Sequence, residues 1–253
     1  MPLVVVDVVL DLPDALRAEA TNLSAVLVER MRLAGHPSRF QLGRPYPGDP
    51  SQDGCEPHVS LFMLSVERAE IDELLTAVRA VAGTVAPIVA SGHEYRPNPQ
   101  GAPELHYHRS DPWHALQHAV VTAAEPLRRG RLREVDPAGE PLAGLVERLR
   151  REEPDGDRLR QLLDYGYDEI GDRFRPHVTL AWPADGAPPS LADLPGPDAF
   201  SGVLVDLAVH GMAGNGTCTT RYGGFTLAGG GPVGSAGAAT HGGEQHDVRP
   251  VGR

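Results

Sequence analysis

A five-residue pattern, Pro-His-Val-Ser/Thr-Leu, occurs twice in this chain, and the repeat constrains the fold more than any other feature of the sequence. Residues 56–61 read Glu-Pro-His-Val-Ser-Leu, and residues 175–180 read Arg-Pro-His-Val-Thr-Leu. The β-branched and apolar residues that follow each histidine are typical of strands. Side chains two positions apart on a strand project from the same face. Each copy therefore presents an imidazole and a hydroxyl on one face, and its valine and leucine to a core on the other.

The two copies together offer groups suited to phosphodiester chemistry. His58 and Ser60 come from the first copy, and His177 and Thr179 come from the second. A neutral imidazole can take a proton from a nucleophile, and a protonated one can deliver a proton to a leaving oxygen, because the unperturbed pKa of histidine is about 6.5. The hydroxyls would donate hydrogen bonds to non-bridging phosphate oxygens. One His-x-Ser/Thr match is weak evidence, but two with matched flanking residues predict one shared site.

The paired motifs resemble those of the two-histidine (2H) phosphoesterase superfamily, whose hallmark is two His-x-Ser/Thr motifs, each followed by a hydrophobic residue. The superfamily includes bacterial 2′-5′ RNA ligase-like proteins and RNA 2′,3′-cyclic phosphodiesterases. The matching positions here are His58, Ser60, Leu61, His177, Thr179 and Leu180. The chain departs from the family in the long spacing between its histidines. It also departs at Trp182, which stands where many bacterial members carry a basic residue.

The resemblance implies an α+β fold of two lobes over residues 1–228, each lobe an antiparallel or mixed sheet with helices outside, around a central cleft. It implies hydrolysis of a 2′,3′-cyclic phosphate, or of a related phosphodiester in a nucleotide or RNA end, to leave a 2′-phosphate. It implies no metal and no other cofactor. One histidine would be the base and the other the acid, and the motifs leave open which is which.

Local patterns predict an order of elements that fits an α+β fold better than a doubly wound parallel sheet. Besides the two motifs, strands are expected at 3–12, 85–95, 104–108, 202–210 and 219–227. Helices are expected at 67–82, at 111–124, and from Asp14 to a stop at Gly35. The last of these would have one apolar, inward-facing side formed by Leu16, Leu23, Val26, Leu27 and Met31. Residues 37–57 are expected to form a loop, and the Gly/Ala-rich residues 229–253 a disordered tail.

Candidate substrate contacts lie outside the motifs. Residues 128–172 are interpreted as an insertion with helical patterns near 141–152 and 157–164. Its alternating charges indicate either a solvated helical surface or a lid that brings arginines to a phosphate. Arg175, next to the second motif, would add positive charge. Tyr107, on the predicted strand 104–108, would stack on a base or sugar, or else pack in the core.

Composition limits the partners. A formal net charge of −11 argues against binding long nucleic acids, whereas a small phosphorylated substrate or an RNA end needs only a few local arginines. All 23 basic residues are arginine, which excludes a catalytic lysine. The two cysteines provide neither a disulfide framework nor a four-cysteine zinc site. With no signal-peptide pattern and no apolar run near the roughly 20 residues of a membrane span, we expect a cytoplasmic monomer without a membrane partner.

Four histidines between residues 106 and 118 offer a rival site. His106 and His108 would share one face of a strand, and His114 and His118 one face of a helix. Such a cluster would suit a metal-dependent hydrolase, although no acidic residue stands at a recognised spacing from it. A further alternative is a module that binds a nucleotide or an RNA end without turning it over.

Overall fold

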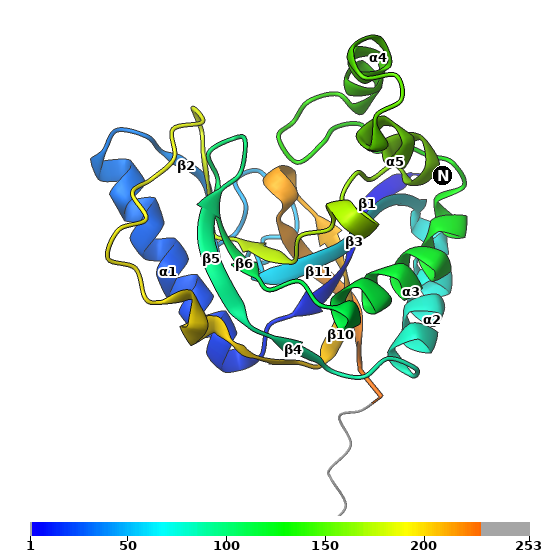
Figure 1. Ribbon diagram of the computed structural model, residues 1–253, viewed down its shortest axis with the longest axis horizontal. Coiled ribbons are helices and arrows are strands. Elements are labelled where there is room, and N and C mark those ends of the chain that lie inside the picture. Colours follow the sequence, from blue (N-terminus) through cyan, green and yellow to red (C-terminus); the bar gives the residue numbers. More distant parts are fainter. Residues whose placement is uncertain (1, 229–253) are drawn as a thin grey trace, which may run out of the picture.

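Two antiparallel sheets carry the two histidine motifs, one motif in each sheet (Figure 1). The computed structural model describes residues 2–228. The first sheet has the order β11-β10-β1-β3, and its strands are β1 (Leu3–Asp11), β3 (His58–Glu67), β10 (Asp206–Met212) and β11 (Cys218–Thr226). The second has the order β5-β6-β7, and its strands are β5 (Gly92–Pro97), β6 (Pro103–Tyr107) and β7 (His177–Thr179). The motif strands β3 and β7 are each an edge strand, and these two edges contact each other.

Two short strand pairs complete the α+β architecture. β2 (Ser38–Gln41) pairs with β8 (Ala181–Pro183), so the predicted loop at 37–57 contains a strand. β4 (Ile88–Ala90) pairs with β9 (Gly202–Leu204), so the single strand expected at 85–95 is in fact two strands with different partners. The division falls just before Gly92, where a Cβ atom would collide with the backbone of Pro197. Only glycine allows the two backbones to approach this closely.

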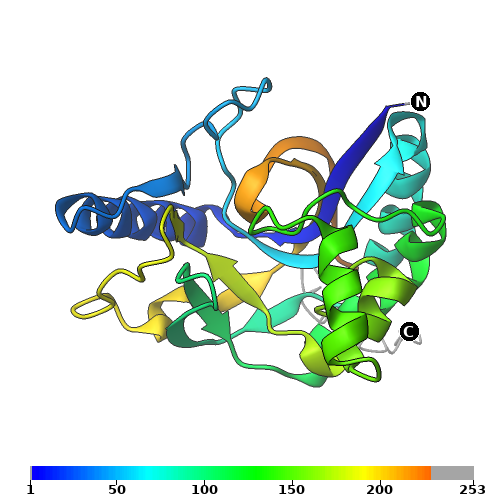
Figure 2. The same ribbon diagram turned by 90° about the horizontal axis from the view of Figure 1, so that it is seen from above.

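Helices cover the sheets from opposite ends of the molecule (Figure 2). α1 (Asp14–Leu33) packs on β2 and β8, while α2 (Ile71–Ala82) and α3 (Asp111–Arg128) pack on each other and on the four-stranded sheet. α1 buries a stripe at helical spacing, formed by Leu16, Ala20, Leu23, Leu27 and Met31. The prediction that Val26 faces inward is wrong, because its position on the helix leaves it 46% exposed. α2 begins later than expected because β3 continues to Glu67 and a 3-10 turn, Arg68–Glu70, follows it.

An irregularity in β3 positions the first motif. The register between β1 and β3 shifts, so that Val8 pairs with Phe62 and Val9 with Ser60, which leaves Leu61 as an extra residue. Such a bulge reverses which face later side chains occupy. Met63 therefore lies on the same side of the strand as the motif, while the bulged residue and its neighbour Phe62 are both fully buried in the core.

The predicted insertion contains the two expected helices, α4 (Leu142–Glu152) and α5 (Asp157–Tyr165). They pack on each other and bury a small apolar cluster of their own: Leu142, Leu145, Val146, Leu149, Leu159 and Leu162. α4 projects from the rest of the molecule, with α5 between it and the sheets (Figure 1). No helix in the described part of the chain is long and apolar enough to cross a membrane. The tail predicted at 229–253 lies outside the described residues.

Candidate active site

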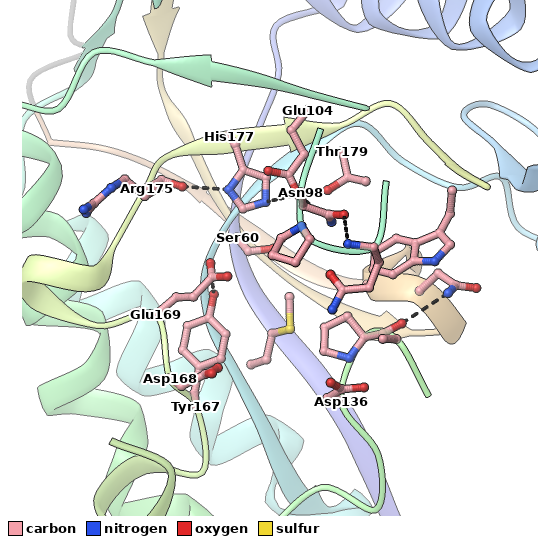
Figure 3. A pocket seen from close by; sticks show the side chains of 18 of the residues that line it. Ser60, Asn98, Glu104, Asp136, Tyr167, Asp168, Glu169, Arg175, His177 and Thr179 are labelled. Atoms are coloured by element: carbon pink, nitrogen blue, oxygen red, sulfur yellow. Dashed lines mark hydrogen bonds and ion pairs between the residues drawn. The ribbon is translucent and has the colours of Figure 1, made fainter. Parts of the chain in front are cut away.

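A cavity of about 650 Å³ lies where the two motif strands meet, and all four motif residues line it. His58 and Ser60 come from β3, and His177 and Thr179 from β7. The inserted segment 128–172 forms another wall of the cavity (Figure 3). A volume of this size suits a ligand as large as a nucleotide. The repeated segments thus meet at one cavity.

Each motif histidine is held by the carbonyl group two residues before it. His58 Nδ1 lies 2.6 Å from the carbonyl oxygen of Glu56, and His177 Nδ1 lies 2.7 Å from that of Arg175. A carbonyl oxygen only accepts hydrogen bonds, so each Nδ1 carries a hydrogen and each Nε2 is left for proton transfer. The accepting carbonyl belongs to the residue before a proline in both copies, and proline restricts that residue to an extended backbone. The proline therefore helps to aim the imidazole.

The surroundings of His58 keep it neutral. Its Nε2 lies 3.5 Å from the sulfur of Cys218 and 3.9 Å from Oδ2 of Asp7. Burial lowers the pKa of His58 to about 4, because a charged imidazole would lose its hydration. Burial likewise raises the pKa of the Asp7 carboxyl to about 7, and it raises the pKa of the Cys218 thiol well above its usual range. At neutral pH the first motif therefore presents an unprotonated imidazole.

The surroundings of His177 have the opposite effect. Burial by itself would lower the pKa of His177, but the carboxylates of Glu104 and Glu169 outweigh burial and raise it. Oε1 of Glu104 lies 3.7 Å from His177 Nε2, accepts a hydrogen bond of 2.8 Å from Asn98 and so stays fixed. The other oxygen of Glu104 lies 3.0 Å from Nε2 of His106. Although burial acts to raise the pKa of Glu104, these partners lower it overall. The second motif therefore favours a protonated imidazole.

The two motif hydroxyls are used differently. Ser60 donates a hydrogen bond of 2.7 Å to Oδ2 of Asp7, a fully buried carboxyl on β1. Thr179 makes no side-chain hydrogen bond within residues 2–228, and its hydroxyl is free for a ligand. If Asp7 is protonated, it can donate to Ser60 instead and release the serine hydroxyl toward the cavity. The protonation of Asp7 thus decides what Ser60 offers to a substrate.

The two predicted substrate contacts have different outcomes. Arg175 lines the cavity, but its guanidinium points away from His177 and donates to the carbonyl oxygens of Asp172 and Phe174 (Figure 3). Its role stays a prediction. The prediction that Tyr107 contacts substrate is wrong, because this residue is only 2% exposed and packs on Trp113 in the core. Glu104 and His106 occupy the cavity face of β6, so the alternation of the strand turns Tyr107 to the opposite face.

The four histidines at 106–118 do not form a cluster. Only His106 reaches the cavity, where its ring lies 5.5 Å from that of His177. His108 stacks on His93, His114 packs on Phe174, and His118 is exposed. The structure instead offers two other groups whose ligand atoms lie within 4.8 Å of one another: Asp7 with His58 and Cys218, and Glu104 with His106 and His177. A metal held by either group would occupy a motif histidine.

Sequence reasoning missed the acidic residues that distinguish the two histidines. Asp7 is the one acid within a run of valines on β1, and its isolation there signals a buried functional group. Glu104 stands two residues before His106, on the same strand face. Glu169 belongs to the inserted segment, and nothing in its local sequence marks it.

Several solved structures are similar to this chain at low identity. LigT from E. coli, crystallised with NADP+, is 15% identical over 90% of this chain and 99% of LigT, with a TM-score of 0.45. TT0787 from Thermus thermophilus is 18% identical over 89% of this chain and 99% of its own, with a TM-score of 0.47. Both belong to the 2H phosphoesterase superfamily. Usb1 from Kluyveromyces marxianus, solved with uridine monophosphate, is 13% identical over 86% of this chain and 97% of its own, with a TM-score of 0.34.

No family model matches the chain. No curated protein matches its sequence either.

Proposed function

We propose that this protein is a metal-independent phosphodiesterase that opens a 2′,3′-cyclic phosphate, or a related phosphodiester, of a nucleotide or an RNA end. One observation carries the proposal: two imidazoles line one cavity, each bonded to a carbonyl oxygen through Nδ1, and they have opposite preferences for a proton on Nε2. The pKa of His58 is lowered to about 4 by burial, so it is a base at neutral pH, whereas the pKa of His177 is raised by Glu104 and Glu169, which favours its acid form. General acid–base catalysis needs this combination.

The reaction follows from these protonation states. Nε2 of His58 takes a proton from a water molecule as its oxygen attacks the phosphorus atom. The bond from phosphorus to the 3′ oxygen breaks, and Nε2 of His177 delivers its proton to that oxygen. The product is a 2′-phosphate beside a free 3′ hydroxyl. One proton has entered at His58 and one has left from His177, so exchange with solvent restores both groups.

The hydroxyl and arginine side chains of the cavity would hold the charge that develops on the phosphate. Thr179 has a free hydroxyl that can donate to a non-bridging oxygen, and Ser60 can do the same while Asp7 is protonated. Preorganised donors of this kind stabilise a transition state because they need not reorient during the reaction. Arg175 at the cavity wall would attract the anionic substrate.

The direct test is an assay of 2′,3′-cyclic mononucleotides and of short oligonucleotides that end in a cyclic phosphate, each with and without a chelator. We expect turnover that a chelator does not change, and phosphorus NMR should show a 2′-phosphate product. Loss of turnover with chelator and its recovery with Zn²⁺ would instead favour a metal-dependent hydrolase built on Glu104, His106 and His177. Binding of these compounds without any hydrolysis would identify a binding module.

A further inference from the structure

One buried arginine of the cavity has no counter-ion among the described residues. Arg133 belongs to the inserted segment, is only 5% exposed, and lines the cavity. Its Nη1 has only the sulfur of Met63, at 3.4 Å, as a partner, and its guanidinium carbon lies 5.9 Å from the centre of the Tyr167 ring. Its Nε has no hydrogen-bond partner, and the side chain forms no ion pair within residues 2–228. A guanidinium that is buried in this way is costly unless an anion joins it.

A neighbouring arginine shows how this fold satisfies a buried guanidinium that has a structural role. Arg128 is 3% exposed, and its terminal nitrogens donate to the carboxylate of Glu125 and to the carbonyl oxygens of Arg131 and Asp164. Three oxygen acceptors thus surround the terminal nitrogens of Arg128, although its Nε, like that of Arg133, has no hydrogen-bond partner in the described part of the chain. The contrast indicates that the acceptors of Arg133 are to come from a ligand.

The acidic groups nearest to Arg133 already interact with other residues. Arg158 holds Asp168 at 2.6 Å. Asp136 accepts a hydrogen bond from the backbone of its own loop. Asp7 is bonded by Ser60 and is fully buried, which favours its uncharged form. Arg133 therefore contributes a free positive charge to the cavity wall.

The bulge in β3 places this charge beyond the hydroxyl end of the first motif. Met63 lies on the same face as Ser60, one strand repeat of about 6–7 Å further from His58. Arg133 touches Met63, so it is displaced from the point where a phosphate would lie between the two histidines. A single ribose separates two phosphates by a comparable span.

We propose that Arg133 binds a second phosphate of the substrate, carried on the 5′ oxygen of the nucleotide whose cyclic phosphate lies between the histidines. The inference rests on the proposed function for the place of the first phosphate. It makes Arg133 a specificity residue that selects a 5′-phosphorylated nucleotide or an RNA end over a nucleoside cyclic phosphate. Guanidinium suits this role because its fork of donors matches two oxygens of a phosphate.

Equilibrium binding of product analogues tests the inference without turnover. Isothermal titration calorimetry would compare adenosine 2′-monophosphate, adenosine 2′,5′-bisphosphate, and a dinucleotide with a terminal 2′-phosphate. We expect the wild-type protein to bind one or both of the last two about 10–100-fold more tightly than the monophosphate, as charge-assisted hydrogen bonds imply. A stronger preference for the dinucleotide identifies an RNA end as the source, and a stronger preference for the bisphosphate identifies a free nucleotide.

The Arg133→Met variant should lose this preference and keep its affinity for the monophosphate within about threefold. Arg133→Lys should retain part of the preference, because it keeps the charge without the fork. Arg96→Met is the matched control, since Arg96 also lines the cavity but already has a carboxylate partner, Glu94, which does not line it. It should leave the preference intact.

Three results would overturn the inference: a wild-type protein with no preference, an Arg133→Met variant that weakens all three ligands equally, or one that changes none of them. The first result is obtained with the wild-type protein alone, so it can refute the inference even if the Arg133→Met variant does not fold. Failure of cyclic-phosphate hydrolysis would refute the proposed function and leave these binding results in place. Equal binding of the three ligands by an active enzyme would refute only the role of Arg133.

Discussion

The two copies of the motif have the same local geometry and opposite electrostatics. In both, the histidine Nδ1 bonds to the carbonyl group that precedes a proline, and in both a hydroxyl follows two residues later. His58, however, lies among a protonated thiol and a carboxyl whose pKa is raised to about 7, whereas His177 lies beside the carboxylates Glu104 and Glu169. The motif therefore determines where an imidazole points, and its neighbours determine whether it carries a proton.

The difference in protonation between the two histidines makes the two sides of the site chemically distinct. Two equivalent histidines would compete for the same protonation state at any pH. Unequal pKa values allow base and acid to coexist in most molecules over a broad range of pH. The inequality comes from groups outside the motifs: burial lowers the pKa of His58, whereas Glu104 of β6 and Glu169 of the inserted segment raise that of His177.

Replacing either motif histidine should have the largest effect on catalytic activity. We expect His58→Asn and His177→Asn each to lower kcat on a 2′,3′-cyclic nucleotide by about 10²–10⁴-fold. A nucleotide diester with a p-nitrophenolate leaving group separates the two roles, because that group departs without a proton. His177→Asn should lose far less activity on this substrate, and His58→Asn should lose as much as before.

The exposed His118 provides a control, since His118→Asn should leave both activities unchanged. Rescue of the His58 variant by the better leaving group, rather than of the His177 variant, would reverse the assignment of base and acid.

The pH dependence of activity should show the difference between the pKa values of His58 and His177 in the wild-type protein. Activity should rise as His58 loses its proton near pH 4, and fall only above pH 6.5, because the raised pKa of His177 postpones its deprotonation. Glu104→Gln removes one of the charges that raise that pKa, so the alkaline limb should move to lower pH and the rate at pH 8 should drop about tenfold. Steady-state kinetics from pH 3.5 to 9 would measure both limbs.

Glu94→Gln on the adjacent strand β5 is the matched control, because Glu94 pairs with Arg96 and does not line the cavity. It should leave the alkaline limb in place. An unchanged limb in Glu104→Gln would show that Glu104 does not tune His177.

Stability measurements can test the protonation state of Asp7, the buried carboxyl beside the first motif. The folded protein raises the pKa of Asp7 from 3.8 to about 7, so it holds this proton more firmly than the unfolded chain does. Asp7 is then increasingly destabilising as pH rises from about 4 to 7. Asp7→Asn should raise the free energy of unfolding at pH 8 by up to about 4 kcal/mol, with little change at pH 4. Urea unfolding at the two pH values would measure this, and an equal effect at both would contradict the buried proton.

The smallest effect is expected at Tyr107. Its hydroxyl is buried without a hydrogen-bond partner in the described part of the chain, and burial raises the pKa of this phenol beyond its usual range. Tyr107→Phe should therefore be neutral or stabilise the fold by about 1 kcal/mol, with kcat and KM within about twofold of wild type. Thermal unfolding and steady-state kinetics would check both. A large rise in KM would restore Tyr107 as a substrate contact.

The features of the fold and the site that depend on local sequence pattern could be predicted from the sequence alone. The repeated Pro-His-Val segment indicated that His58 and His177 lie close together, and they line one cavity; the helical patterns located α4 and α5 within about one residue. Tyr107 was misplaced although the signal was present: Glu104 and His106 are the polar residues of β6, and alternation leaves Leu105 and Tyr107 for the core.

Long-range contacts could not be read from the chain in the same way. The approach of Asp7 to Ser60 depends on the pairing of β1 with β3 and on the bulge at Leu61, which shifts the register by one residue. The environment of Arg133 depends on how the inserted segment folds back over β3. Such features arise from tertiary packing, and no local periodicity encodes them.

The carbonyl acceptor that orients each imidazole belongs to the main chain, and this has an evolutionary consequence. In many acid–base sites a carboxylate both orients the histidine and sets its basicity, so one substitution disturbs both properties. Here orientation survives any exchange of the residue before the proline, because every amino acid brings the same carbonyl oxygen. Acidic neighbours can therefore be gained or lost beside one copy of the motif without changing the direction of its ring, and two copies with the same geometry can acquire different chemical roles.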